Sequence, residues 1–328
     1  MATQSSAHLP KDLLGTFSPR ANHWVGDGFH VRNLFPSNAL GERLSPFLML
    51  DYAGPTRFEP TERARGVGLH PHRGFETVTI VYQGQVAHRD SAGNSGVIGP
   101  GDVQWMTAAR GVVHEELHAP EFARRGGVLQ MVQLWINLPA KHKLSTPKYQ
   151  GILAADIPEV PLGSNGVRAR VIAGRLHGEA RGPVGPASTF TPVNVWDVRA
   201  GGGAAATFRL PPTHTAAVVV LEGSARVNGS LLLGEARLAL LDRGGESVSI
   251  ETEADSLLLV LSGEPLGEPV VSQGPFVMNT PAEIRQAFAD YQSGRMGHLP
   301  EAPRASARVP EPGTSSRVSS NRGGPRGA

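Results

Sequence analysis

The feature that most constrains the fold of this chain is the shortness of its apolar segments. They are rich in Val and Leu, and turns such as Gly99-Pro100-Gly101-Asp102 separate them. Segments of this length are typical of β-strands, and such turns typically join strands. The 40 glycines and 27 prolines among 328 residues favour the same interpretation. We therefore expect an all-β sandwich or barrel. The apolar segments are 47–50, 77–82, 128–138, 193–198, 215–221, 247–252 and 256–261.

One segment near the C-terminal end has helical periodicity instead. It spans residues 281–291, follows the N-cap residue Thr280, and places Ile284, Ala287 and Phe288 on one face. We expect a short C-terminal helix that packs across a sheet.

A weak internal repeat predicts two domains. Residues 79–87 are similar to residues 218–226, because each is an apolar strand, a turn glycine and a second strand. The two copies indicate tandem barrels, which we place at residues 20–145 and 163–295. The boundary is expected in the loop-like stretch 145–162.

Charge and composition set the last segment apart. Residues 300–328 are rich in Pro, Gly, Ser and Arg, with five arginines against two glutamates, and we expect this tail to be disordered. The preceding residues have 26 Lys and Arg against 27 Asp and Glu, so direct binding to nucleic acid is not expected. No apolar segment is long enough for a membrane span or a signal peptide, which predicts a cytoplasmic protein.

A cluster of histidines is the strongest functional signal. Residues i and i+2 of an extended chain point to the same face, so His70 and His72 can reach one ion, and His114 and Glu116 can do the same from a second strand. The chain has no cysteine, which excludes thiolate sites and disulfides. Three histidines and one glutamate suit a first-row divalent metal such as iron, manganese, nickel or zinc.

Other residues near this cluster have competing interpretations. Glu76 shares the strand parity of His70 and His72 but lies about 13 Å from His72 in an extended chain. We interpret Glu76 as a residue beside the ligands, and a ligand role stays open. His88 and His118 are interpreted as residues of the surface or the cavity rim.

The histidine motifs resemble those of the pirin family in the cupin superfamily. The residues that carry the resemblance are His-Pro-His-Arg-Gly-Phe-Glu-Thr at 70–77, the segment 99–111, His114 and Glu116, and further segments extend it over about residues 20–295. The resemblance implies a bicupin of two jelly-roll barrels. It also implies one metal, normally iron, held by His70, His72, His114 and Glu116. Ala109 stands where pirins commonly have glycine, which predicts a tight turn.

The second half lacks these motifs. The one His-x-Glu after residue 150, His177-Gly178-Glu179, has no partner pair and is interpreted as a surface loop, and His214 and His298 are isolated. We expect a metal-free C-terminal barrel that covers one face of the first.

The resemblance implies a quercetin 2,3-dioxygenase, which opens a flavonol ring with O2 and releases carbon monoxide. Glu116 would be both a ligand and the base for the flavonol hydroxyl. The metal would be Fe(II), with Ni, Mn, Cu, Co and Zn as alternatives. Phe29, Trp105, Met106 and Gln133 are candidates for the substrate cavity, and each is equally interpreted as a core residue.

The alternative function is a metal- or redox-dependent regulatory protein that binds a protein partner without turnover. A further metal-dependent oxygenase or isomerase and a degenerate cupin are weaker alternatives. We expect a monomer in each case.

Overall fold

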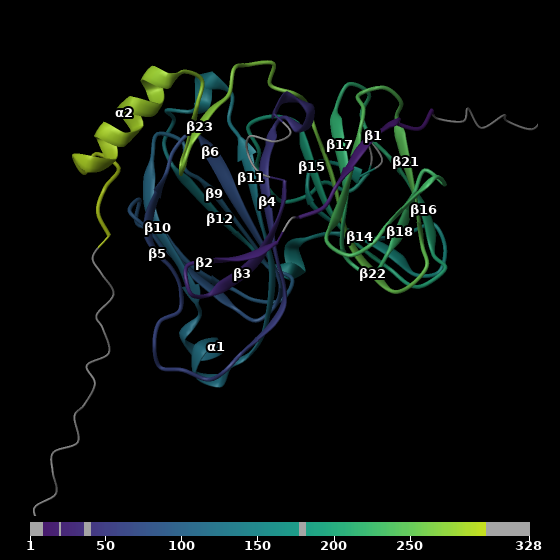
Figure 1. Ribbon diagram of the computed structural model, residues 1–328, viewed down its shortest axis with the longest axis horizontal. Coiled ribbons are helices and arrows are strands. Elements are labelled where there is room, and N and C mark those ends of the chain that lie inside the picture. The colour runs from purple at the N-terminus through teal and green to yellow at the C-terminus, as the bar shows by residue number, and fades with distance from the viewer. Residues whose placement is uncertain (1–8, 20, 36–40, 177–181, 300–328) are drawn as a thin grey trace, which may run out of the picture.

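The chain forms two β-barrels that lie side by side (Figure 1). The computed structural model describes residues 9–19, 21–35, 41–176 and 182–299. The expected tail at 300–328 and the motif at 177–179 therefore lie outside the described residues. The all-β architecture with a short C-terminal helix is confirmed. Neither helix of the described residues is long and apolar enough to cross a membrane.

Each barrel consists of a seven-stranded and a four-stranded antiparallel sheet. The large sheet of the first barrel has the order β12 (Lys148–Ile152), β9 (Val103–Thr107), β6 (Phe75–Gln83), β11 (Gly127–Asn137), β4 (Phe47–Phe58), β3 (Phe29–Phe35) and β2 (Asn22–Val25). Its small sheet has the order β5 (Gly66–His72), β10 (Val112–His118), β7 (Val86–Asp90) and β8 (Ser95–Ile98). Short helical segments connect the strands: η1 (Gly41–Leu44), α1 (Pro120–Arg125), η2 (Ala140–His142) and η3 (Ala154–Asp156).

The second barrel repeats this arrangement. Its large sheet has the order β1 (Leu13–Phe17), β20 (Arg237–Leu241), β17 (Thr215–Glu222), β22 (Ser256–Gly263), β15 (Val193–Ala200), β14 (Val167–Ala173) and β13 (Glu159–Leu162). Its small sheet has the order β16 (Ala205–Arg209), β21 (Ser247–Thr252), β18 (Ala225–Val227) and β19 (Leu231–Leu233). The N-terminal strand β1 thus crosses to the second barrel, where it pairs with β20.

The two large sheets share one apolar core. Side chains alternate along a strand, so Val78 and Ile80 of β6 point out of the first barrel and contact the core that includes Val219 and Leu259 of the second. Thr77 and Thr79 of β6 point the other way, into the first barrel. The interior of the second barrel is filled by a separate apolar cluster around Trp196.

The stretch between the barrels is more ordered than a loop. Residues 145–162 contain β12, which pairs with β9 of the first barrel, and β13, which pairs with β14 of the second. The chain therefore passes from the first barrel to the second between β12 and β13.

The C-terminal segment packs on the first barrel. It contains β23 (Val271–Gln273), β24 (Phe276–Met278) and α2 (Pro281–Gln292). Ile284 and Ala287 of α2 pack in the same cluster as Val113 of β10, and Asp290 forms an ion pair with Arg73 at 2.7 Å. Figure 1 shows α2 on the side of the first barrel away from the second. The expected limits 163–295 group this segment with the second barrel along the sequence.

The expected N-cap of α2 is present. The Thr280 hydroxyl accepts a hydrogen bond from the Glu283 N–H at 3.2 Å, and the Glu283 carboxylate accepts one from the Asn279 N–H at 3.0 Å. This reciprocal arrangement satisfies two backbone donors at the start of the helix.

Candidate metal centre

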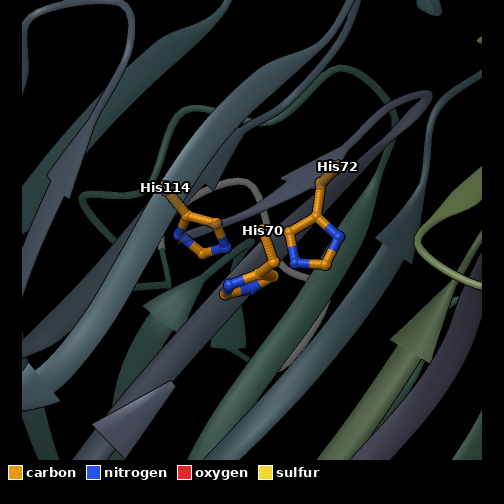
Figure 2. A group of neighbouring side chains, drawn as sticks. All are labelled: His70, His72 and His114. Carbon is orange, nitrogen blue, oxygen red and sulfur yellow. The ribbon is translucent and has the colours of Figure 1, made fainter. Parts of the chain in front are cut away.

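Three histidines converge inside the first barrel. Strands β5 and β10 pair so that His70 lies opposite His114, and the alternation of β5 puts His72 on the same face as His70. One donor atom from each of the three rings lies within 4.8 Å of the others. Figure 2 shows the three rings turned toward one another. The local spacing in the sequence thus brings these side chains together as expected.

Hydrogen bonds leave one nitrogen of each ring free. The Nδ1 atom of His70 lies 2.7 Å from the Gly68 carbonyl, and Nδ1 of His72 lies 3.4 Å from the Pro275 carbonyl. Since a carbonyl accepts only, both Nδ1 atoms carry the proton and both Nε2 atoms carry a lone pair. Nε2 of His114 is buried without a hydrogen-bond partner. A divalent metal ion satisfies such nitrogens, so this donor set fits one.

Burial keeps two of these rings neutral. It lowers the pKa of His72 and His114 well below the usual value, and the proximity of His70 lowers the pKa of both further. Neutral imidazole is the form that coordinates a metal.

Glu116 lies beside the histidines and is held by hydrogen bonds. The strand register shifts between His114 and Glu116. Oε1 of Glu116 accepts a hydrogen bond from the Gln104 amide at 3.0 Å, whereas Oε2 has only the Gln133 amide at 3.5 Å. The Thr79 hydroxyl lies 3.0 Å from Oε1 of Glu116 and 2.7 Å from Oε1 of Gln133, and its one proton serves one of these acceptors at a time. Glu116 is not among the donor atoms within 4.8 Å of one another, but it lines the same cavity.

The cavity in front of the histidines has a volume of about 210 Å³ and mostly apolar walls. Phe29 and Gln133, two of the expected cavity residues, line it. Trp135, which the sequence motifs do not indicate, also lines the cavity, and its ring centroid lies 5.2 Å from that of His72. Trp135 lies two residues after Gln133, and alternation along a strand puts both side chains on the same face. This spacing could have indicated Trp135. The remaining lining residues are Val25, Val31, Met49, Asp51, Val67, His70, His72, Glu116 and Met131.

Two other expected cavity residues lie elsewhere. Since Gln104 of β9 points to Glu116, the adjacent Trp105 points outward into the core between the barrels. Met106 packs in a small cluster with Val112 and does not line the cavity.

Glu76 was interpreted as a neighbour of the ligands, and this is wrong. Gly74, with φ of 90°, separates β5 from β6 and breaks the strand parity that links Glu76 to the histidines. Glu76 points to the same side of β6 as Val78, where it accepts a hydrogen bond from the Thr107 hydroxyl at 2.7 Å. Burial raises the pKa of Glu76 to about 7.

The expected tight turn after β9 is present. Ala109 has φ of 43°, a left-handed conformation that glycine adopts more easily. Its carbonyl accepts a hydrogen bond from the Gly74 N–H at 2.8 Å, which ties this turn to the end of β5.

The interpretation of His88 and His118 as surface residues is wrong, since each is only 3% exposed. His118 packs against Phe58 and Phe122, and its Nε2 atom lies 2.9 Å from the Gly28 carbonyl. His88 lies directly behind His114, with 3.4 Å between their Nδ1 atoms. Both errors arise because the inward face of a barrel strand depends on its pairing partner.

Comparison with known proteins identifies the family. Residues 28–136 match the family described as Pirin, and residues 195–297 match the Pirin C-terminal cupin domain. This chain belongs to the pirin family. Its two barrels are therefore the tandem cupin barrels of a pirin, as the sequence motifs implied.

Related pirins cover nearly the whole described chain. A Pseudomonas aeruginosa protein, provisionally named a quercetin 2,3-dioxygenase, is 54% identical over 285 residues, 87% of this chain and 98% of the relative. A pirin-like protein from Solanum lycopersicum is 40% identical over 300 residues, 90% and 97% of the two chains. The crystal structure of a quercetin 2,3-dioxygenase from Acinetobacter baumannii matches with a TM-score of 0.85 and 52% identity, covering 88% and 99%.

Proposed function

We propose that this pirin is a metal-dependent dioxygenase that opens the ring of a flavonol, with quercetin as the first substrate to test, and releases carbon monoxide. The observation that supports this proposal most is the convergence of three imidazoles beside the Glu116 carboxylate at one apolar cavity. The names of the Pseudomonas and Acinetobacter relatives support the same activity.

In this proposal, His70, His72, His114 and Glu116 hold one divalent ion. Fe(II) is our first choice, and Ni, Mn, Cu, Co and Zn are alternatives, because imidazole and carboxylate ligands suit all of them. The ion would supply the Lewis-acid and redox chemistry that brings O2 and an ionised substrate together. Oε2 of Glu116 is the oxygen available for this role, since the Gln104 amide donates to Oε1.

Glu116 also acts as the base of the proposed reaction. Its carboxylate accepts the proton of the flavonol 3-hydroxyl group, so the O–H bond breaks, the carboxyl group becomes neutral and the substrate becomes an anion beside the histidines. The hydrogen bonds to Oε1 fix the carboxylate in this position before substrate arrives. Positioned proton transfer of this kind contributes about 10²–10⁴-fold to a rate.

The cavity walls suit one flat ring system. Phe29 and Trp135 offer aromatic faces, and Met49 and Met131 offer flexible apolar contacts. The volume of about 210 Å³ is below the roughly 300–1,000 Å³ of pockets that bury a whole drug-sized ligand. We therefore expect the ring that carries the 3-hydroxyl group to enter, while the rest of the flavonol stays at the cavity mouth.

The test begins with protein purified without added metal. Elemental analysis gives the resident ion, and incubation with quercetin under air follows the loss of visible absorbance and the release of carbon monoxide. We expect one ion per chain and turnover. His70→Ala should lose the stoichiometric ion, and Glu116→Gln should lower kcat by about 10²–10⁴-fold.

His298→Ala is the matched control, because His298 is exposed and lies outside the cavity. Full metal occupancy in His70→Ala would place the ion elsewhere, and unchanged turnover in Glu116→Gln would remove the proposed base. A bound ion without turnover on any flavonol would favour the alternative, a metal-dependent regulatory protein. A monomeric state and a cytoplasmic location stay predictions, to be tested by light scattering and cell fractionation.

A further inference from the structure

A buried pair of side chains lies behind His114, on the side away from the cavity. Strands β7 and β10 pair so that Asp90 is opposite His114 and His88 is opposite Glu116. Nε2 of His88 lies 3.3 Å from Oδ2 of Asp90, and Nδ1 of His88 lies 3.4 Å from Nδ1 of His114. A carboxylate, an imidazole and a second imidazole thus form one continuous chain of contacts.

Gln104 determines where the protons of this chain lie. Its Nε2 amide donates to Oε1 of Glu116 at 3.0 Å, and its Oε1 atom accepts from the Tyr149 hydroxyl at 3.4 Å. The same Nε2 amide faces Nδ1 of His88 at 3.4 Å. Because an amide NH2 only donates, Nδ1 of His88 carries a lone pair and the His88 proton lies on Nε2, directed at Asp90.

The tautomer of His114 follows from that of His88. Nδ1 of His114 faces the lone pair of His88, so it carries the proton, and Nε2 of His114 is left with a lone pair. That Nε2 atom is the buried nitrogen without a hydrogen-bond partner. The chain of contacts therefore presents a bare lone pair to the place where the ion would bind.

Asp90 is itself held in a fixed orientation. Its Oδ1 atom accepts hydrogen bonds from the backbone N–H groups of Ala92 at 2.9 Å and Asn94 at 3.0 Å, and the Asn94 side-chain amide donates to Oδ2 at 2.9 Å. The stacking of His88 on Tyr149, with 5.0 Å between ring centroids, fixes the ring plane.

We propose that Asp90 and His88 are positioning residues that select the metal-binding tautomer of His114 and increase its electron donation to the ion. This inference rests on the proposed metal centre. His70 and His72 have only backbone carbonyls behind them, so His114 is the ligand with an anionic partner in its hydrogen-bond chain. Partners of this kind raise ligand basicity, and their loss typically costs about 10–100-fold in metal affinity.

Paired variants at His88 separate this role from packing. In His88→Asn, the amide oxygen stands near the position of Nδ1 and still accepts from His114, whereas His88→Leu fills a similar volume without an acceptor. Titration of the metal-free full-length protein with Co(II) and Fe(II) should show about a 10–100-fold loss of affinity for His88→Leu. The loss for His88→Asn should be distinctly smaller, and the midpoint potential of bound iron should rise in His88→Leu.

Asp90→Asn tests the tautomers of His88 and His114. It keeps the hydrogen bonds that hold residues 90–94 in place, because the amide oxygen can still accept from the N–H groups of Ala92 and Asn94. The amide NH2 then faces Nε2 of His88 and favours the opposite proton arrangement along the chain. We expect a loss of affinity for Co(II) and Fe(II) of at least about 10-fold. Thermal unfolding of each metal-free variant separates this loss from a general loss of stability.

His214→Gln is the control, since His214 is a buried histidine of the second barrel. Wild-type affinity and potential in His88→Leu and Asp90→Asn would overturn the positioning role while the metal centre stands. Equal losses in His88→Asn and His88→Leu would also overturn it. A wild-type protein that binds neither ion would overturn the metal centre and this inference with it.

Discussion

At the scale of single residues, the site was predictable where the geometry is local. His70 and His72 share a face because an extended chain has a two-residue period, and this needs no knowledge of a partner strand. The positions of Glu76 and His88 are not local in this sense. The turn at Gly74 moves Glu76 to the other side of its sheet, and the pairing of β7 with β10 brings His88 behind His114.

The buried Glu76 carboxyl should make stability depend on pH. Its pKa is about 7 in the folded chain, against 4.5 for an ordinary glutamate. Between these values the folded state binds more protons than the unfolded state, so stability falls as the pH rises from 4.5 to 7. Glu76→Gln does not titrate, so its free energy of unfolding should exceed that of wild type by on the order of 2–3 kcal/mol at pH 8. The difference should be small at pH 4.5.

Urea unfolding of wild type and Glu76→Gln at both pH values measures this difference. Glu59→Gln serves as the control, because Glu59 is exposed on the same barrel. A stability difference that is the same at pH 4.5 and pH 8 would show that Glu76 does not titrate as described.

At the scale of elements, strands were easier to predict than their partners. The Val- and Leu-rich segments at 77–82 and 215–221 lie within strands β6 and β17. The pairing of β1 with β20 of the second barrel and the docking of α2 on the first barrel were not predictable. Each depends on contacts between residues far apart in the sequence, which a local pattern does not encode.

Lys11 fixes the N-terminal segment to the second barrel. Its buried ammonium lies 3.1–3.3 Å from the carbonyl oxygens of His214, Asp242, Arg243 and Gly244, which share its three N–H donors. Lys11→Met leaves these acceptors without their charged donor and should lower the free energy of unfolding by roughly 2–3 kcal/mol. Denaturant titration checks this value, with the exposed Lys141→Met as control, and equal stability of the two variants would contradict it.

At the scale of the whole molecule, the two barrels behave as one folding unit. Their large sheets share an apolar core, and a buried polar contact crosses the same interface. Arg170 of β14 forms an ion pair with Asp197 at 2.9 Å and donates to the Gly101 carbonyl of the first barrel, while the Tyr82 hydroxyl of the first barrel donates to Asp197. We therefore expect a single cooperative unfolding transition.

Removing one partner of this ion pair should be costly. Arg170→Met leaves the Asp197 carboxyl buried without its cation and should lower the free energy of unfolding by about 3–5 kcal/mol. The double variant Arg170→Met/Asp197→Leu should recover much of this loss, since neither charge remains. Calorimetry of the three proteins provides the measurement. Two separate transitions in wild type, or a double variant no more stable than Arg170→Met, would contradict this account.

The pairing of β1 with β20 of the second barrel also determines when this sheet can be completed during translation. Leu13 pairs with Leu241, so β1 leaves the ribosome more than 220 residues before the strand with which it pairs. At about 5–20 residues per second, this delay is on the order of ten to forty-five seconds. The first barrel can assemble from its own strands during that time, but the sheet that carries β1 is completed only when β20 emerges.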